Sequence, residues 1–196
     1  IRDRNSPGVE VKPIKNMAGD RHFAEIFFID VQVPLENRLG AEGEGWKVTV
    51  SALANERSSI GEVTQMFSKL DELKDLVKST QVQGKPAAED PAVRRQLARF
   101  ETKIAAMKYN GLRYLTKQIK GEPLSSETSV NKLHRASLEI EMDDFAVSLS
   151  GEAGLQLKGG ENAVGGGSWS KSALNWPNVV IGGGTPNIQR LSLIHI

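Results

Sequence analysis

Residues 90–121 read DPAVRRQLARFETKIAAMKYNGLRYLTKQIKG, and this stretch decides the fold class. Asp90 followed by Pro91 is typical of a helix start, because the aspartate caps free backbone N–H groups and proline suits the first helical position. Gly121 ends the pattern. Between them apolar residues recur at intervals of four and three, which is the pattern of one buried helix face: Val93, Leu97, Phe100, Ile104, Met107, Gly111 and Tyr114. The stretch therefore predicts a long helix at the seam of a helical bundle.

Two further stretches show helical periodicity, one on each side of this helix. The first runs from Trp46 to about Ser79, and the second from about Ser126 to Ser150. We expect a polar loop over residues 81–89. Residues 151–168 are rich in glycine and predict a loop, followed by a short helix around Trp169.

The first forty residues show β structure instead. The run from Glu25 to Val33 alternates, with Phe27, Ile29, Val31 and Val33 on one face, and Pro34 ends it. Two strands cannot bury themselves alone. We therefore expect residues 1–40 to be the C-terminal strands of a larger β domain and residues 41–190 to form an antiparallel four-helix-bundle domain. The predicted fold class is mainly α with a β remnant (α+β).

Composition excludes several classes of site. The 196 residues carry a net charge of +1, which does not favour bulk nucleic-acid or membrane binding, and 39% hydrophobic residues, as in an ordinary globular protein. No run of apolar residues approaches the length of a membrane span. The absence of cysteine excludes disulfides and thiolate metal sites. His22, His134 and His195 lack the spacing of a zinc site, so we expect no metal. The chain begins with Ile1, and we expect it to start within a longer protein.

Residues 181–190 read IGGGTPNIQR and are the clearest candidate for a ligand site. Glycines let backbone N–H groups approach a ligand closely, and Thr185 with Pro186 predicts a helix start whose N–H groups suit an anion or a carbonyl oxygen. Upstream, Glu56 and Arg57 place a carboxylate beside a fixed cation, which suits proton transfer. The alternatives are a mobile glycine loop and an ordinary surface glutamate paired on a solvated helix face.

Five segments, in this order, resemble the acyl-CoA dehydrogenase family. PGV at 7–9, DVQVP at 30–34 and GEGW at 43–46 are similar to the end of its middle β domain. ERSSIG at 56–61 and GGTPNIQR at 183–190 are similar to its C-terminal helical domain. The resemblance implies about half of an enzyme that uses FAD to dehydrogenate an acyl-CoA thioester, and that this segment alone is inactive.

The resemblance also implies roles for individual residues. Many members carry the base that removes the α proton directly before the Gly-Thr of the closing motif, where this chain has Gly183. A minority carry it in a Glu-Arg pair on the long helix, which makes Glu56 the candidate base. The Gly183 N–H is then left to polarise the thioester carbonyl. Arg57 and Gly182 are the candidate substrate contacts, and the candidate FAD contacts are Gly184, Thr185 and Asn187.

The glycines at 182–184 predict a wider acyl pocket for a branched or ring-bearing chain. Two family segments that hold FAD are altered: residues 81–86 lack an expected arginine, and residues 148–154 lack a glutamine and a glycine. These losses resemble a divergent bacterial branch with unlike subunits, and imply a cytoplasmic homo- or hetero-oligomer with electron-transferring flavoprotein as acceptor. Residues 191–196 do not resemble the family and are expected to be a non-native tail.

Two alternatives to a working dehydrogenase stay open. One is a non-catalytic partner subunit of the same fold that lacks its own base. The other is a DNA-binding relative, suggested by eight basic residues between 91 and 120 against the single acid Glu101. Because these residues spread around the helix, a salt-bridged bundle surface is the favoured interpretation.

Overall fold

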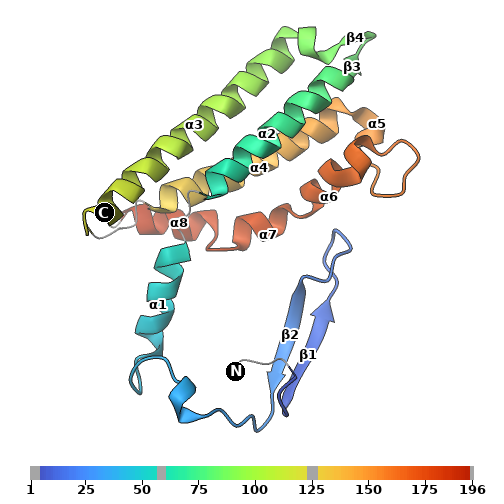
Figure 1. The fold of residues 1–196 in the computed structure, drawn as a ribbon. Coiled ribbons are helices and arrows are strands. Elements are labelled where there is room, and N and C mark those ends of the chain that lie inside the picture. Colours follow the sequence, from blue (N-terminus) through green and yellow to red (C-terminus); the bar gives the residue numbers. More distant parts are fainter. Residues whose placement is uncertain (1–4, 57–60, 123–127, 195–196) are drawn as a thin grey trace. The chain divides into compact units, whose positions relative to one another are not determined.

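The computed structural model describes residues 5–56, 61–122 and 128–194 (Figure 1). The chain forms two compact units, Ile1–Leu53 and Ala54–Ile196. The first contains a hairpin, and the second contains the long helices.

The hairpin of the first unit pairs β1 (Val9–Ile14) with β2 (Phe23–Phe28) in antiparallel register, from Val9 opposite Phe28 to Ile14 opposite Phe23. The strand expected to reach Val33 therefore ends five residues early. The Ile29 N–H donates to the Gly8 carbonyl, and Asp30 then adopts a left-handed φ of 50°, which turns the chain out of the ladder.

Large apolar side chains of this hairpin are exposed in the chain by itself. Ile26 and Phe28 are 54% and 61% exposed. A short 3₁₀ turn, η1 (Leu35–Asn37), follows, and then α1 (Gly45–Glu56). The helical pattern expected from Trp46 to about Ser79 is present as α1 and as α2 (Gly61–Ser79). Residues 57–60, which lie between them, are outside the described part of the chain.

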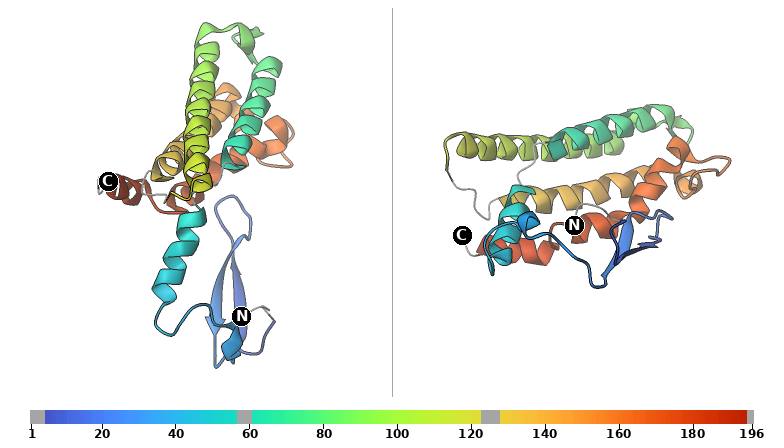
Figure 2. Two further views of the ribbon diagram at one scale, coloured as in Figure 1. Left: turned by 60° about the vertical axis from the view of Figure 1, so that its left-hand side comes forward. Right: turned by 60° about the horizontal axis from the view of Figure 1, so that its bottom comes forward.

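Three long helices form the second unit. They are α2, α3 (Pro91–Ile119) and α4 (Thr128–Leu149), and α3 runs antiparallel to its two neighbours (Figures 1 and 2). The predicted start of α3 is confirmed, since the Asp90 carboxylate accepts the Ala92 N–H at 2.6 Å. The expected loop at 81–89 contains a small hairpin, β3 (Gln81–Val82) with β4 (Lys85–Pro86), and then η2 (Ala87–Glu89).

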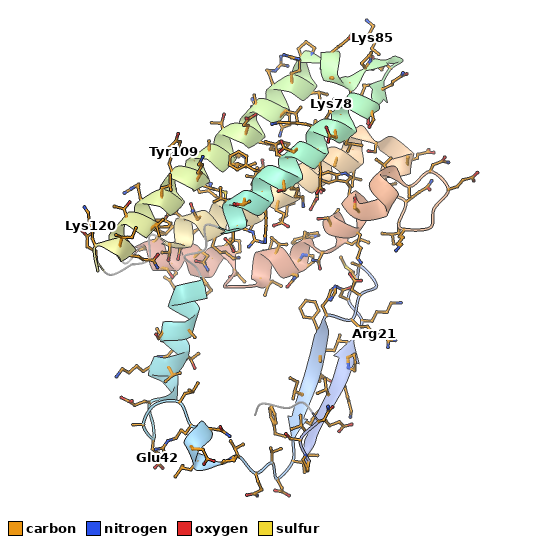
Figure 3. All side chains as sticks on the ribbon, in the orientation of Figure 1. Arg21, Glu42, Lys78, Lys85, Tyr109 and Lys120 are labelled. Carbon is orange, nitrogen blue, oxygen red and sulfur yellow. The ribbon has the colours of Figure 1, made fainter. Side chains whose placement is uncertain are left out.

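The core of this unit lies between α2, α3 and α4. Six of the seven seam residues predicted on α3 are buried, and Leu97 is partly buried and packs against them. Phe100 meets Phe145 of α4 edge to face, with ring centroids 5.8 Å apart. On the outer side of α3, Tyr109 is 66% exposed (Figure 3), and Lys103 pairs with Glu141 at 2.5 Å.

A row of short helices follows α4 and packs against it. These are α5 (Gly151–Gly154), α6 (Ser168–Leu174), α7 (Trp176–Ile181) and α8 (Pro186–Ile194), with the 3₁₀ turn η3 (Val164–Gly167) before α6. The short helix expected around Trp169 is confirmed as α6, and Trp169 itself joins the core. The predicted fold class, mainly helical with a small β part, is confirmed.

Candidate functional site

A cavity of about 230 Å³ lies at the glycine turn between α7 and α8. Its walls come from three helices of the second unit and from the turn itself: Glu62 on α2, Lys132, Arg135 and Ala136 on α4, Asn178 and Val179 on α7, and Gly182 and Gly183. The cavity thus brings the glycine motif at 182–183 together with polar side chains of α2 and α4 that no sequence motif indicates.

The charged side chains around this cavity are held by ion pairs and hydrogen bonds. Arg135 Nη1 lies 2.6 Å from Glu62 Oε1, and its Nε lies 3.6 Å from Glu139 Oε2. Lys132 Nζ donates to the Val180 carbonyl at 2.8 Å, at the C-terminal end of α7, where a cation meets the negative end of the helix dipole. These contacts fix α2, α4 and α7 around the cavity.

The glycine turn adopts a backbone conformation that few other residues accept. Gly183 and Gly184 have φ values of +68° and +103°. The Gly184 N–H donates to the Ile181 carbonyl at 3.1 Å, and the Gly182 N–H donates to the Asn178 carbonyl at 2.8 Å. In the described part of the chain the Gly183 N–H donates to no acceptor. One unpaired backbone donor therefore lies at the wall of the cavity.

The three glycines differ in the room they leave for a side chain. A Cβ at Gly182 would lie 2.9 Å from the Asn178 carbonyl oxygen, and one at Gly184 would lie 2.6 Å from Gln189 Nε2. At Gly183 the nearest atom, Lys132 Cε, would be 3.7 Å away, which is ordinary contact. Of the three positions of the turn, only Gly183 has open space beside it.

The remaining candidates of the closing motif stand at the start of α8. Thr185 Oγ1 accepts the Ile188 N–H at 3.4 Å, as the predicted helix start requires. Asn187 is exposed and its Oδ1 accepts from Arg190 Nη1 at 3.3 Å. Neither residue lines the cavity. Both place polar atoms at the start of α8, where a helix N-terminus suits an anionic or polar group.

The candidate base and its neighbour are not placed relative to this cavity. Glu56 is the last residue of α1, and its side chain lies outside the described part of the chain. Arg57 is also outside the described residues.

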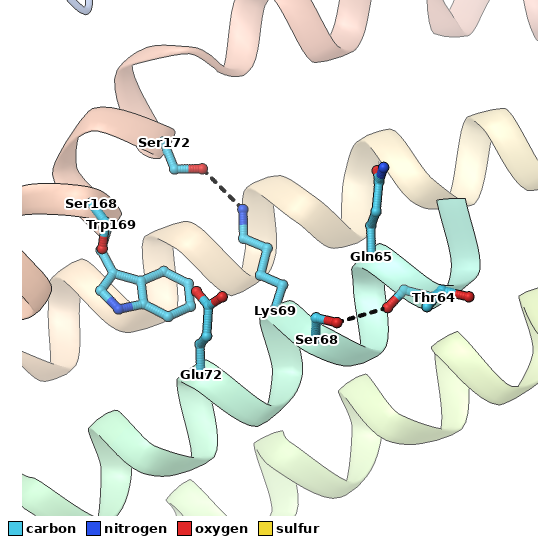
Figure 4. A pocket seen from close by; sticks show the side chains of 8 residues that line it. All are labelled: Thr64, Gln65, Ser68, Lys69, Glu72, Ser168, Trp169 and Ser172. Atoms are coloured by element: carbon cyan, nitrogen blue, oxygen red, sulfur yellow. Dashed lines mark hydrogen bonds between the residues drawn. The ribbon is translucent and has the colours of Figure 1, made fainter. Parts of the chain in front are cut away.

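A second, larger cavity of about 700 Å³ lies between α2 and α6 (Figure 4). Lys69 is one of its lining residues, with Nζ 2.7 Å from Asp143 Oδ1 and 2.9 Å from the Ser172 hydroxyl. Ser172 in turn donates to Asp143 Oδ2 at 2.8 Å. Burial raises the pKa of the Asp143 carboxyl above its ordinary value, because loss of hydration outweighs the stabilisation by Lys69 and Ser172.

Sequence reasoning did not single out the side chains of either cavity. Lys132 and Arg135 sit in an ordinary helical pattern, and no spacing rule connects them to residues about fifty positions downstream. Gln189 was part of the quoted motif, but no role was assigned to it.

Comparison with known proteins identifies the family. The family model described as "Acyl-CoA dehydrogenase, C-terminal domain" matches residues 43–195. The chain belongs to the acyl-CoA dehydrogenase family. It is 31% identical over 188 residues to acyl-CoA dehydrogenase IpdE1 of Mycolicibacterium smegmatis, covering 95% of this chain and 44% of that protein. The chain thus spans a little under half the length of this relative.

Solved structures of the family share the fold. An acyl-CoA dehydrogenase from Geobacillus kaustophilus superposes with a TM-score of 0.81 at 24% identity, covering 98% of this chain and 50% of that one. The ChsE4–ChsE5 complex from Mycobacterium tuberculosis gives 0.81 at 23% identity, covering 98% and 51%. Among the described residues, no helix is long and apolar enough to cross a bilayer.

Proposed function

We propose that this chain is the C-terminal part of a longer FAD-dependent acyl-CoA dehydrogenase that removes the α proton and the β hydride of an acyl-CoA thioester. The single observation that carries the proposal is the unpaired Gly183 N–H at the wall of a cavity, in a chain of this family. Such a donor stabilises the enolate oxygen that develops when the α proton leaves. FAD, when bound, supplies the acceptor for the hydride.

In this proposal Glu56 is the base, since position 183 has no side chain to remove a proton. Removal of an α proton needs a carboxylate in a water-poor pocket, where desolvation brings its pKa toward that of the substrate. The open space beside Gly183 supports a base supplied from elsewhere, because no side chain of the turn fills it. Arg57 and Gly182 would contact the substrate, and Gly184, Thr185 and Asn187 would contact FAD.

The domain arrangement belongs to the same proposal. Residues 1–40 would complete a β domain of the proposed longer protein, which is supported by the exposed apolar side chains of β1 and β2. Residues 41–190 would form the helical domain, and residues 191–196 would be a non-native tail. Electron-transferring flavoprotein is the proposed acceptor.

A specific observation favours a second candidate, a non-catalytic subunit of a hetero-oligomer. The usual base position is Gly183, and one solved structure that this chain resembles is a complex of two proteins, ChsE4 and ChsE5. In that case the partner subunit would supply the working site, and Glu56 would have no role in proton transfer.

The experiment uses the longer gene product, expressed with any adjacent paralogue. Wild type, Glu56→Gln and the exposed control Glu101→Gln are compared for bound FAD and for flavin bleaching by a panel of acyl-CoAs. We expect Glu56→Gln to keep FAD and to lose bleaching by roughly 10²–10⁴-fold, with the control unchanged. Equal bleaching by wild type and Glu56→Gln would overturn the role of Glu56.

A rescue variant sharpens this test. Gly183→Glu in the Glu56→Gln background places a carboxylate where the family often has its base, in the one position of the turn with open space. Partial return of bleaching would support convergence of both positions on one α carbon. Absence of bleaching by wild type with every acyl-CoA would favour the non-catalytic subunit.

A further inference from the structure

Gln189 is the most buried polar residue of α8 and is directed back at the glycine turn. Its exposed fraction is 0%. Its Nε2 donates to the Gly183 carbonyl at 2.7 Å and lies 3.3 Å from the Gly184 carbonyl. One side-chain amide therefore engages two successive carbonyl groups of the turn that carries the unpaired N–H.

These contacts hold one peptide plane at both of its edges. The plane between Gly183 and Gly184 has its oxygen bound by Gln189 and its N–H bound by the Ile181 carbonyl at 3.1 Å. The preceding plane, between Gly182 and Gly183, carries the unpaired N–H. The two planes share the Gly183 Cα, where φ is +68°. Glycine by itself accepts many orientations of these planes, so holding the second plane limits the directions open to the unpaired N–H.

The turn and the glutamine fit one another closely. A Cβ at Gly184 would lie 2.6 Å from Gln189 Nε2, so glycine at 184 is what lets the amide reach the carbonyls. The amide oxygen of Gln189, by contrast, gains no hydrogen bond from this arrangement. Gln189 Oε1 is buried without a hydrogen-bond partner in the described part of the chain. An apolar side chain of the same length would avoid that unfavourable burial, so the donor end of the amide is the reason for a glutamine here.

We infer that Gln189 is a positioning residue, which fixes the direction of the Gly183 N–H toward the carbonyl oxygen of a thioester in the cavity. This inference rests on the proposed function in one respect, namely that the acceptor of the Gly183 N–H is a thioester carbonyl oxygen. The hold of Gln189 on the peptide plane between Gly183 and Gly184 does not depend on the proposed function, because all of its contacts lie within this chain.

The first test measures the geometry in the 196-residue chain by amide hydrogen exchange. Gln189→Met keeps the length of the side chain and removes its donor. Asn131→Leu is the matched control, since Asn131 is also a buried amide that donates to a backbone carbonyl (Met107, 3.1 Å) and has an unpartnered oxygen. We expect the Gly184 amide to exchange roughly tenfold faster in Gln189→Met and at the wild-type rate in Asn131→Leu. Equal exchange of Gly184 in the two variants would overturn the inference.

The second test measures the consequence in the longer, FAD-loaded protein. We expect Gln189→Met and Gln189→Glu to keep FAD and KM close to wild type and to lower kcat by at least about tenfold, because neither side chain can hold the carbonyls. A kcat that falls only with the folded fraction would show a structural role and would overturn the inference. If wild type itself fails to bleach with acyl-CoA, the proposed function fails, while the exchange of Gly184 still decides whether Gln189 holds the turn.

Discussion

The two cavities of the helical unit differ in whether their polar groups find partners within the protein. In the larger one, the partly buried ammonium of Lys69 is matched by the buried Asp143 carboxylate at 2.7 Å and by the Ser172 hydroxyl. In the smaller one, the described residues leave the Gly183 N–H without an acceptor. A polar group that the fold itself satisfies contributes to holding helices together. A donor without a partner at the wall of an open cavity, at an exposed residue such as Gly183, is available to a ligand.

The largest expected effect comes from breaking the ion pair of the larger cavity. Lys69→Met would leave the carboxylate of Asp143, which is 3% exposed, without its partner. We expect a loss of roughly 3–5 kcal/mol in the free energy of unfolding, measured by urea denaturation of the chain.

Two companion variants show whether this loss comes from the pair. Lys74→Met removes a more exposed lysine of the same helix, paired with Glu101 at 3.4 Å, and should cost less than about 1 kcal/mol. The double variant Lys69→Met/Asp143→Leu should recover most of the loss, because no unpaired charge stays buried. Equal losses of unfolding free energy in Lys69→Met and Lys74→Met would show that the Lys69–Asp143 pair contributes no more to stability than an exposed pair.

The second effect concerns the packing of the glycine turn. In Gly184→Ala the new Cβ would lie 2.6 Å from Gln189 Nε2, at a residue with a φ of +103°. We expect a loss of roughly 2–3 kcal/mol, the sum of backbone strain and displacement of the glutamine. Gly166→Ala is the control for backbone strain alone, because its φ is +64° and no atom lies within 4 Å of its Cβ. A loss no greater than that of Gly166→Ala would show that the turn does not depend on Gln189.

The third effect is smaller and tests the open space beside Gly183. Gly183→Ala places a methyl group 3.7 Å from Lys132 Cε without a clash. The expected loss is about 1 kcal/mol, close to that of Gly166→Ala, because a positive φ is the only penalty. Thermal and urea denaturation of the two variants measure this directly, and a loss like that of Gly184→Ala would contradict the assignment of open space.

The same contrast explains which features could be predicted from sequence. The seam of α3 was predictable because periodic apolar residues such as Phe100 and Ile104 can be buried in only one way, on one helix face. The start of α8 was predictable from the local chemistry of Thr185 and Pro186. The early end of β2 was not, because alternation continues past Phe28 and only the left-handed Asp30 breaks the ladder.

The candidate site was predictable in its backbone and not in its surroundings. Glycines at 182–184 indicate a turn open to a ligand, whichever residues surround it. Lys132 and Arg135 reach the turn only because α4 packs along α7, and that packing is a tertiary property. The roles expected for Glu56 and Arg57 stay predictions.

The smallest expected effect is a pH dependence that belongs to the larger cavity. Because burial raises the pKa of Asp143 above 3.8, the folded chain binds this proton more tightly than the unfolded chain. The contribution of Asp143 to stability is therefore greatest below 3.8 and falls as pH rises through the raised pKa. The difference in unfolding free energy between wild type and Asp143→Asn, which does not titrate, should decrease over that window and level off above it. A difference that increased with pH would mean that the pairing with Lys69 outweighs burial, and Asp143 would then be a stabilising charge at neutral pH.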